Sequence, residues 1–493
     1  MANTDDQRLK FSYSSFFHRF LNSPYTLSLF SRIYLAVAPL LFLSFSISCQ
    51  ALSAYTTNII QGNAPYLTFD GGQTRVNNTN YLLSISLSDG RKYTANNNSS
   101  IKPIILPNLG ETLANVNMYI PIDNDSIALN SVIGSPYNFW GDDDGDGHGL
   151  LGISATGNLS LTITDKDNQT VSRNAALDIC RAPYKLTLIS TSGELTTQYG
   201  VPNRSLFTGS HATYYINPKI EPKICFVRPQ LAYGSNTEIS GIDFRGPSSM
   251  WNINKGFIPQ STTLSSYAMN FPSTGMNKLY FELDIGGARP LRWDEVEHEG
   301  IKAEITPDST GSRVTVTLTG PAAKDSQFNS NTPGRVAKPV LPQTFELVGR
   351  DSNGSVVVKY GFQLKQWYVN RGDHNYYTYD STLSWCNNIG YRLPHVKDLT
   401  NSICAGPWSS PSCQSSVGAT PPSNGNNYQR IIAAGFFSEW GYMDYYNGNQ
   451  QDNHNYWTID PSNMGGYFSV HSNNGHINSH SSDILLRGLC TVP

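Results

Sequence analysis

The chain has 493 residues, too many for one ordinary hydrophobic core, so we expect about two to four domains. Its 34 basic and 37 acidic residues give a formal net charge of −3 without a basic block, which excludes a typical nucleic-acid-binding protein. Charged residues make up only 14% and aromatic residues 12%, a composition that favours a folded, β-rich extracellular protein over a disordered one.

Residues 33–47 form an apolar run, IYLAVAPLLFLSFSI. A helix that spans a membrane needs about 20 apolar residues, so this shorter run predicts the hydrophobic segment of a signal peptide over residues 1–54. We expect cleavage before Tyr55, with Ala51 as another candidate position. Two alternatives stay open. The segment could remain as an uncleaved N-terminal anchor, or Cys49 could be acylated as a lipid anchor.

Short alternating patterns predict β-strands in the next two domains. Apolar and polar residues alternate over residues 83–87, 159–164 and 184–188, which indicates a β-sandwich-like domain over residues 55–240. A second β domain is expected over residues 241–365. Its signals are strands at 279–285 and 314–318, and a hairpin at 345–360 about the turn Asp351-Ser-Asn-Gly354.

An acidic, glycine-rich loop lies within the first of these domains. Asp142, Asp144 and Asp146 are spaced two apart, and a glycine follows the third. Alternate carboxylates of this kind converge on calcium in the first half of an EF-hand loop, but Ile153 stands where the bidentate acid would be needed. The sequence therefore excludes a full EF-hand. It leaves open a partial calcium loop or a solvated acidic turn.

The last part of the chain, residues 366–493, has a distinctive frame. Trp385 begins the pattern W-C-x-x-x-G-x-R-L-P, Trp457 and Thr458 form a pair, and Cys490 lies near the end. This frame resembles a C-type-lectin-like domain, which implies an α+β fold for residues 366–493. The expected fold class is therefore mostly β, with β-sandwich-like domains followed by an α+β C-type-lectin-like domain.

Six cysteines follow the signal region, and an even number in an exported chain implies disulfides. Six cysteines can pair in many ways, but the domain layout favours Cys180–Cys225, Cys386–Cys490 and Cys404–Cys413. The lectin-like resemblance implies the second pair, which ties the ends of that domain together.

Sugar-binding C-type lectins hold calcium through Glu-Pro-Asn or Gln-Pro-Asp and through Trp-Asn-Asp. This chain instead has Glu439-Trp440-Gly441 and Trp457-Thr458-Ile459-Asp460, so we expect any ligand to be bound without that calcium site. Aromatic side chains beside adaptable amides suit protein or glycan recognition. The candidate ligand-binding residues flank an Asn/Gln/Gly-rich stretch; they are Tyr442, Tyr445, Tyr446 and Tyr456. Trp440 and Trp457 are interpreted as core residues.

Several segments carry a second resemblance; they are Tyr199-Gly-Val-Pro-Asn203, residues 212–219, Cys225-Phe-Val-Arg-Pro229, Gly256-Phe-Ile-Pro-Gln-Ser261 and the stretch from Phe345 onward. Together they resemble the enterobacterial invasin/intimin-like adhesins. The resemblance implies an exported adhesin, at the outer-membrane surface or secreted. Such a protein would bind a protein or glycan on a host or neighbouring cell through the lectin-like domain.

Two other functions stay open: a structural envelope protein or lipoprotein without receptor binding, and a carbohydrate-active enzyme. The sequence has no G-x-S-x-G elbow, phosphate-binding loop or Rossmann fingerprint, so we expect no enzyme and no cofactor besides calcium. Two weak motifs are interpreted conservatively. Arg371-Gly372-Asp373 is taken as a turn rather than an integrin ligand, and the histidines at 454, 471, 476 and 480 are not taken as a zinc site.

Overall fold

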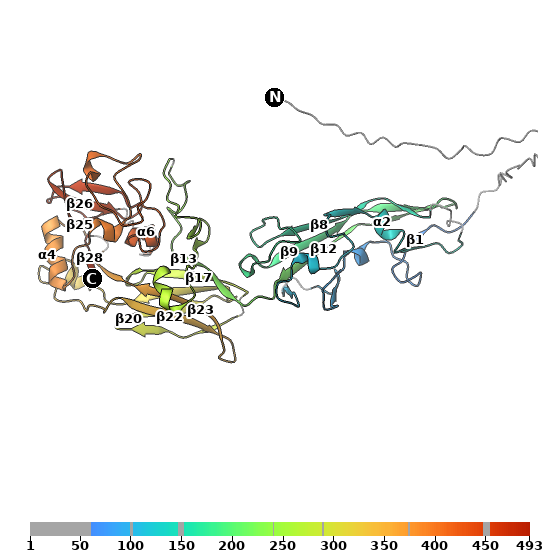
Figure 1. The fold of residues 1–493 in the computed structure, drawn as a ribbon, viewed down its shortest axis with the longest axis horizontal. Coiled ribbons are helices and arrows are strands. Elements are labelled where there is room, and N and C mark those ends of the chain that lie inside the picture. Colours follow the sequence, from blue (N-terminus) through green and yellow to red (C-terminus); the bar gives the residue numbers. More distant parts are fainter. Residues whose placement is uncertain are drawn as a thin grey trace, which may run out of the picture. The chain divides into compact units, whose positions relative to one another are not determined.

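The computed structural model describes residues 61–98, 102–145, 152–239, 241–287, 290–372, 375–446 and 454–493 (Figure 1). The predicted signal peptide, residues 1–54, and Cys49 lie outside these ranges. The fold is mostly β, as predicted, with short helices between the strands. Of the helices in the described ranges, none is both long and apolar enough to cross a membrane.

Residues 61–222 form the first β region, which is built on a five-stranded sheet of order β4-β12-β9-β8-β5. Its central strands β8 (Asn158–Thr164), β9 (Tyr184–Ser190) and β12 (Ser210–Asn217) pair antiparallel. Alternate side chains of β8 and β9 are buried, which confirms the strands predicted from the period-two pattern. Of residues 83–87, only β2 (Ile85–Ser86) is a strand.

The remaining elements of the first β region are short. They are β1 (Tyr66–Leu67), η1 (Asn80–Leu83), β3 (Lys92–Tyr93), β4 (Ile104–Ile105), η2 (Leu113–Asn115), β5 (Ser126–Ala128), α2 (Asn130–Ile133), β6 (Trp140–Gly141), β7 (Ser154–Ala155), η3 (Ile179–Arg181), β10 (Gly193–Thr196) and β11 (Arg204–Phe207). The five-stranded sheet and these short elements together enclose one hydrophobic core, which includes Leu161, Leu186 and Tyr214.

The second β region is a pair of packed sheets. A seven-stranded sheet has the order β14-β15-β13-β17-β21-β20-β19, and a three-stranded sheet has the order β18-β22-β23. Phe281 of the first sheet and Phe362 of the second meet with ring centres 5.7 Å apart. The predicted hairpin is confirmed as β22 and β23, with a turn between Asp351 and Gly354.

The bounds of these elements are β13 (Lys223–Arg228), β14 (Trp251–Asn252), β15 (Gly256–Phe257), η4 (Leu264–Met269), β16 (Thr274–Met276), β17 (Tyr280–Gly286), β18 (Arg292–Trp293), β19 (Val296–His298), β20 (Ile301–Pro307), β21 (Arg313–Thr319), α3 (Asp325–Phe328), β22 (Gln343–Arg350) and β23 (Val356–Leu364). Strand β13 pairs with β17, so the domain boundary predicted at residue 240 is wrong. The seven-stranded sheet of the second β region begins at Lys223, within the range that was expected for the first domain.

Residues 366–493 form the C-terminal region, whose longest helix is α4 (Tyr379–Ile389). The side chain of Thr378 caps its first turn by accepting the N–H of Ser381, and Gly390 ends it in the left-handed conformation, with φ of +89°. Buried residues recur at helical spacing, including Thr382, Trp385 and Ile389. Trp385 and Cys386 of the W-C-x-x-x-G pattern therefore lie on a helix, as the α+β fold implied by the lectin-like frame requires, whereas the C-type-lectin class stays a prediction.

The other elements of this region are β24 (Gln366–Asn370), α5 (Val396–Leu399), η5 (Pro411–Cys413), α6 (Phe436–Trp440), η6 (Met443–Tyr445), β25 (Asn455–Ser462), β26 (Gly466–His471), β27 (Ile477–His480) and β28 (Leu489–Val492). All three predicted disulfides are formed: Cys180–Cys225, Cys386–Cys490 and Cys404–Cys413. The first of them joins the first β region to β13 of the second.

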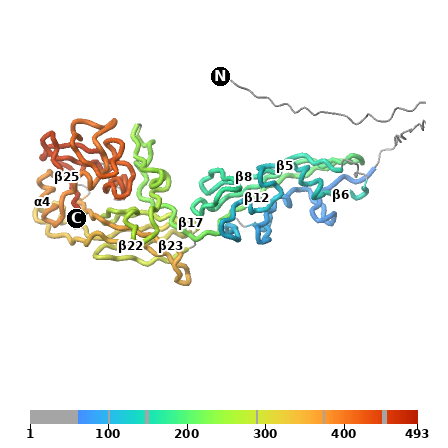
Figure 2. Tube along the Cα trace, in the orientation of Figure 1, coloured from blue at the N-terminus to red at the C-terminus, as the bar shows by residue number. Residues whose placement is uncertain are grey.

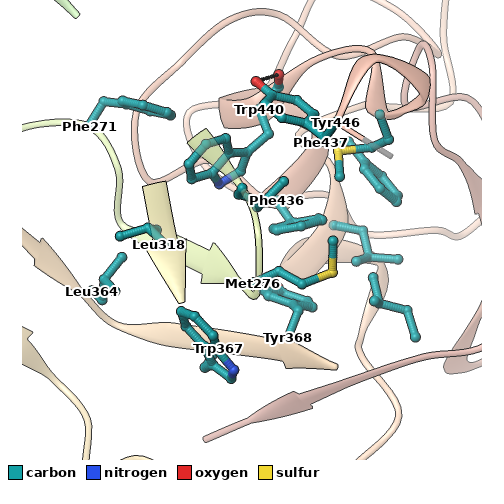
Figure 3. Close-up of a cluster of buried hydrophobic side chains, with 14 of the residues drawn as sticks. Phe271, Met276, Leu318, Leu364, Trp367, Tyr368, Phe436, Phe437, Trp440 and Tyr446 are labelled. Carbon is teal, nitrogen blue, oxygen red and sulfur yellow. Dashed lines mark hydrogen bonds between the residues drawn. The ribbon is translucent and has the colours of Figure 1, made fainter. Parts of the chain in front are cut away.

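The second β region and the C-terminal region share one sheet and one core. Strand β24 lies between β16, from the second β region, and β28, from the end of the chain. Figure 3 shows Trp367 and Tyr368 of β24 in one cluster with Leu318 of β21 and Phe436 of α6. The predicted division between residues 365 and 366 therefore separates two parts that fold around a common interior.

Candidate binding surface

The four candidate tyrosines divide into two kinds. Tyr445 is 55% exposed and Tyr442 is half-buried, and their ring centres are 5.2 Å apart. Both lie in the turn that follows α6, where Gly441 ends the helix with φ of +75°. The structure therefore places this pair at the surface, as expected.

The expectation that Tyr446 and Tyr456 lie at the surface is wrong. Tyr446 is buried, and its hydroxyl donates to the carbonyl of Trp440 at 3.1 Å. Tyr456 is also buried, and its ring lies 5.6 Å from that of Phe437. Both side chains belong to the shared core, as do Trp440 and Trp457, whose interpretation as core residues is confirmed.

A third tyrosine comes from a distant part of the chain. The loop between β13 and β14 carries Tyr233, whose ring centre is 5.4 Å from that of Tyr442. Figure 2 shows this loop in green beside the orange and red C-terminal region. We call Tyr233, Tyr442 and Tyr445 the tyrosine surface. Sequence reasoning missed Tyr233 because no local pattern shows that the loop packs against residues two hundred positions later.

Arg430 holds this loop in place. Its backbone N–H donates to the carbonyl of Phe244 at 3.0 Å, and its Nη2 donates to the carbonyl of Gln230 at 2.9 Å. The guanidinium lies 4.5 Å from the centre of the Trp251 ring, a cation–π contact. Burial lowers the pKa of Arg430. A Cβ at Gly246 would lie 1.8 Å from the carbonyl oxygen of Arg430, so only glycine allows this approach.

Glu439 makes a second connection between the two regions. Its carboxylate accepts the backbone N–H groups of Ser273 and Thr274, each at 3.0 Å, and the Thr274 hydroxyl at 2.6 Å. It also accepts the N–H of Ala433 at 2.8 Å. Complete burial raises the pKa of Glu439, while these donors partly offset that effect. Glu439 is therefore a structural group that aligns the two regions.

Acidic groups surround the tyrosine surface. Burial raises the pKa of Tyr233, and the negative charges of Glu238 and Asp444 raise it further. The pKa of Tyr442 is raised by burial and by a hydrogen bond to Asp444. The hydroxyls of Tyr233 and Tyr442 therefore stay protonated at neutral pH. The surface offers aromatic rings and hydroxyl donors within a mildly acidic rim.

An open groove lies on the other side of the same loop. It has a volume of about 700 Å³ and is lined by residues of both regions, including Asp243, Arg245, Trp251, Pro421 and Gln429. Arg245 is already paired with Asp243, with Nη2 and Oδ2 2.8 Å apart. The two charged side chains of the groove therefore balance each other.

The predicted calcium loop is only partly described, because Asp146 lies outside the described residues. Asp143, between the candidate ligands Asp142 and Asp144, accepts the Tyr66 hydroxyl at 2.8 Å and forms an ion pair with Arg75. Arg75 thus supplies a positive charge to the acidic turn. In the described ranges, no three His, Cys, Asp or Glu side chains are placed to hold a metal ion, so calcium stays a prediction.

Arg371 of the Arg-Gly-Asp triplet is buried. It donates to the carbonyls of Phe328 at 3.0 Å and Ser381 at 2.8 Å, and its guanidinium lies 3.6 Å from the centre of the Tyr377 ring. An integrin ligand must expose its arginine to solvent. Arg371 is instead buried and stabilises the contact between Phe328 and Ser381. Asp373 lies outside the described residues.

No protein-family model matches the chain, and no curated protein matches it. A crystal structure of invasin, described as a bacterial integrin-binding protein, is 14% identical with a TM-score of 0.32; the match covers 70% of this chain and 52% of that one. A C-terminal 282-residue fragment of intimin, in complex with the intimin-binding domain of its translocated receptor, is 10% identical with a TM-score of 0.29; the match covers 63% of this chain and 94% of that fragment. The chain spans about half the length of the invasin structure.

Proposed function

We propose that this chain is an exported adhesin that binds a protein or glycan on a host or neighbouring cell through the tyrosine surface. The observation that carries the proposal is the convergence of Tyr233, Tyr442 and Tyr445 from two distant segments onto one exposed site. Tyrosine is enriched where proteins bind each other, because it offers a large contact area with few rotatable bonds.

The tyrosine surface is also held rigidly, which favours binding. Arg430 fixes the loop that carries Tyr233, and Glu439 fixes the helix that leads to Tyr442. A surface that is already ordered loses less conformational entropy when a partner binds. The proposal needs no covalent chemistry.

The test measures binding of the full exported chain to host cells and to arrays of proteins and glycans. The double variant Tyr442→Ala/Tyr445→Ala should bind at least about tenfold more weakly, because it removes two central aromatic contacts. Tyr199→Ala is the matched control, since Tyr199 is 49% exposed and lies in the first β region. Equal binding by the double variant and the wild type would refute the role of the tyrosine surface, and no binding by the wild type would favour a structural envelope protein.

A further inference from the structure

A small pocket lies on the outer face of the seven-stranded sheet. It has a volume of about 220 Å³, and its lining includes Arg228, Gln230, Tyr280, Glu282 and Arg313. Three neighbouring strands form its floor, because Arg228 of β13 stands opposite Glu282 of β17, which stands opposite Thr315 of β21. The loop that follows β13 closes one side through Gln230.

The charges in this pocket do not balance. The Nε of Arg313 lies 3.4 Å from Oε2 of Glu282, which forms one ion pair. Arg228 has no acidic partner within the described ranges, and so the pocket carries one excess positive charge. That charge complements a single carboxylate, which a guanidinium binds through two parallel hydrogen bonds.

The other lining groups suit a sugar better than a bare anion. Tyr280 is 39% exposed, so part of its ring can pack against the apolar face of a sugar. Gln230 already accepts the N–H of Ala232 through Oε1 at 2.9 Å, which leaves its Nε2 as a donor. Glu282 can accept from a hydroxyl group, whereas it would repel a doubly charged phosphate or sulfate.

The size of the pocket also favours a sugar ligand. Pockets for drug-sized ligands measure roughly 300–1,000 Å³, and this pocket is smaller. It suits a single sugar ring at the end of a chain, with the rest of the glycan in solvent.

We propose that this pocket binds a terminal carboxylated monosaccharide, with its carboxylate on Arg228, its ring on Tyr280 and its hydroxyl groups on Gln230 and Glu282. The proposal does not rest on the tyrosine surface. None of its residues belongs to that surface, so either proposal can fail without the other.

The experiment titrates the full exported chain with sialyllactose and glucuronic acid, and with lactose and glucose as neutral counterparts, by saturation-transfer difference NMR. We expect the acidic sugars to bind and the neutral sugars to bind at least about tenfold more weakly, because they lack the charge-assisted hydrogen bonds. Arg228→Gln and Tyr280→Ala should each weaken binding of the acidic sugars by a similar factor. Arg228→Lys should restore it only in part, because lysine keeps the charge but loses the bidentate geometry.

Arg292→Gln is the matched control, because Arg292 is 80% exposed by its side chain and lies on the other sheet. It should leave binding unchanged. Unaltered thermal unfolding of each variant confirms that the fold is intact. Absence of acidic-sugar binding, equal binding of neutral sugars, or full binding by Arg228→Gln would each overturn the proposal. Binding of a hexaglutamate peptide in place of the sugars would overturn it in favour of an acidic protein partner.

Discussion

The carboxylate of Glu439 accepts the backbone N–H of Ser273 at 3.0 Å, although 166 residues separate them along the chain. This contact joins α6 to the start of β16, the strand that the second β region contributes to the shared sheet. The buried charge has four donors from three residues, so both regions depend on it for their alignment.

Replacing this carboxylate should destabilise the protein strongly. Glu439→Gln puts an amide N–H₂ where the site offers only donors, and we expect a loss of about 2–4 kcal/mol in the free energy of unfolding. Urea unfolding of the full chain measures the loss. Glu297→Gln is the control, because Glu297 is exposed on β19. Equal stability of Glu439→Gln and the wild type would contradict the structural role of the carboxylate.

Residues 366–493 should not fold alone. Without residues 223–365, strand β24 loses its neighbour β16, and Arg430 loses the carbonyl of Gln230 and the ring of Trp251. A fragment of residues 223–493 keeps all of these contacts; it should carry Cys225→Ala, since Cys180 is absent. We expect a cooperative calorimetric transition for the longer fragment only. A cooperative transition in the shorter one would show that the shared core is dispensable.

Stability should fall in mild acid because of His471. Burial, with smaller effects of His476 and His454, lowers the pKa of His471 to about 4, below the value of 6.5 expected without its surroundings. The unfolded chain therefore binds more protons between these two pH values. The stabilisation is complete above about pH 6.5 and is lost as pH falls toward 4, with a total on the order of 3 kcal/mol.

The denaturant midpoint of the full chain, measured between pH 7 and 5, checks this expectation. His471→Gln should flatten part of the pH dependence. Some should remain, because burial also lowers the pKa values of His476 and His480. His211→Gln, at an exposed position of β12, should not change the slope. An unchanged slope in His471→Gln would show that another group is responsible.

The two disulfides of the C-terminal region should differ in their effect on stability. Cys386–Cys490 closes a loop of 104 residues and Cys404–Cys413 one of 9. In the chain-entropy model their removal costs about 4–5 and about 2–3 kcal/mol respectively. Unfolding of the paired Cys→Ala variants of the full chain compares them. A larger loss for Cys404–Cys413 would mean that local packing outweighs loop length.

Local patterns in the sequence were sufficient for much of the fold. The hairpin of β22 and β23 follows from its turn residues, and the helix α4 was implied by the lectin-like frame around Trp385. The disulfide Cys386–Cys490 was expected from the lectin-like frame. In each case the residues that carry the signal lie close together in the chain or form a recurrent pairing.

The candidate site was less accessible to sequence reasoning. Tyr445 and Tyr446 are adjacent and chemically identical, yet one is exposed and the other buried. The difference comes from Gln230, whose N–H donates to the Tyr446 hydroxyl at 2.7 Å from 216 residues away. A burial pattern that depends on so distant a partner leaves no periodicity in the local sequence. The burial of Arg430 could not be predicted from the local sequence either. It is explained by tertiary contacts with distant residues, the Gln230 carbonyl and the Trp251 ring.

The sheet β16-β24-β28 also bears on how such a protein could change its partner over evolution. A genetic crossover near residue 366 would join a foreign β24 to a resident β16, and Glu439 and the Thr274 hydroxyl that it accepts would then come from different parents. A crossover just before Lys223 would transfer sheet, core, loop and tyrosine surface together. It would cut the Cys180–Cys225 disulfide and the ion pairs Lys166–Asp284 and Lys255–Asp167. Residues 223–493 are therefore the unit that would carry the proposed binding surface intact.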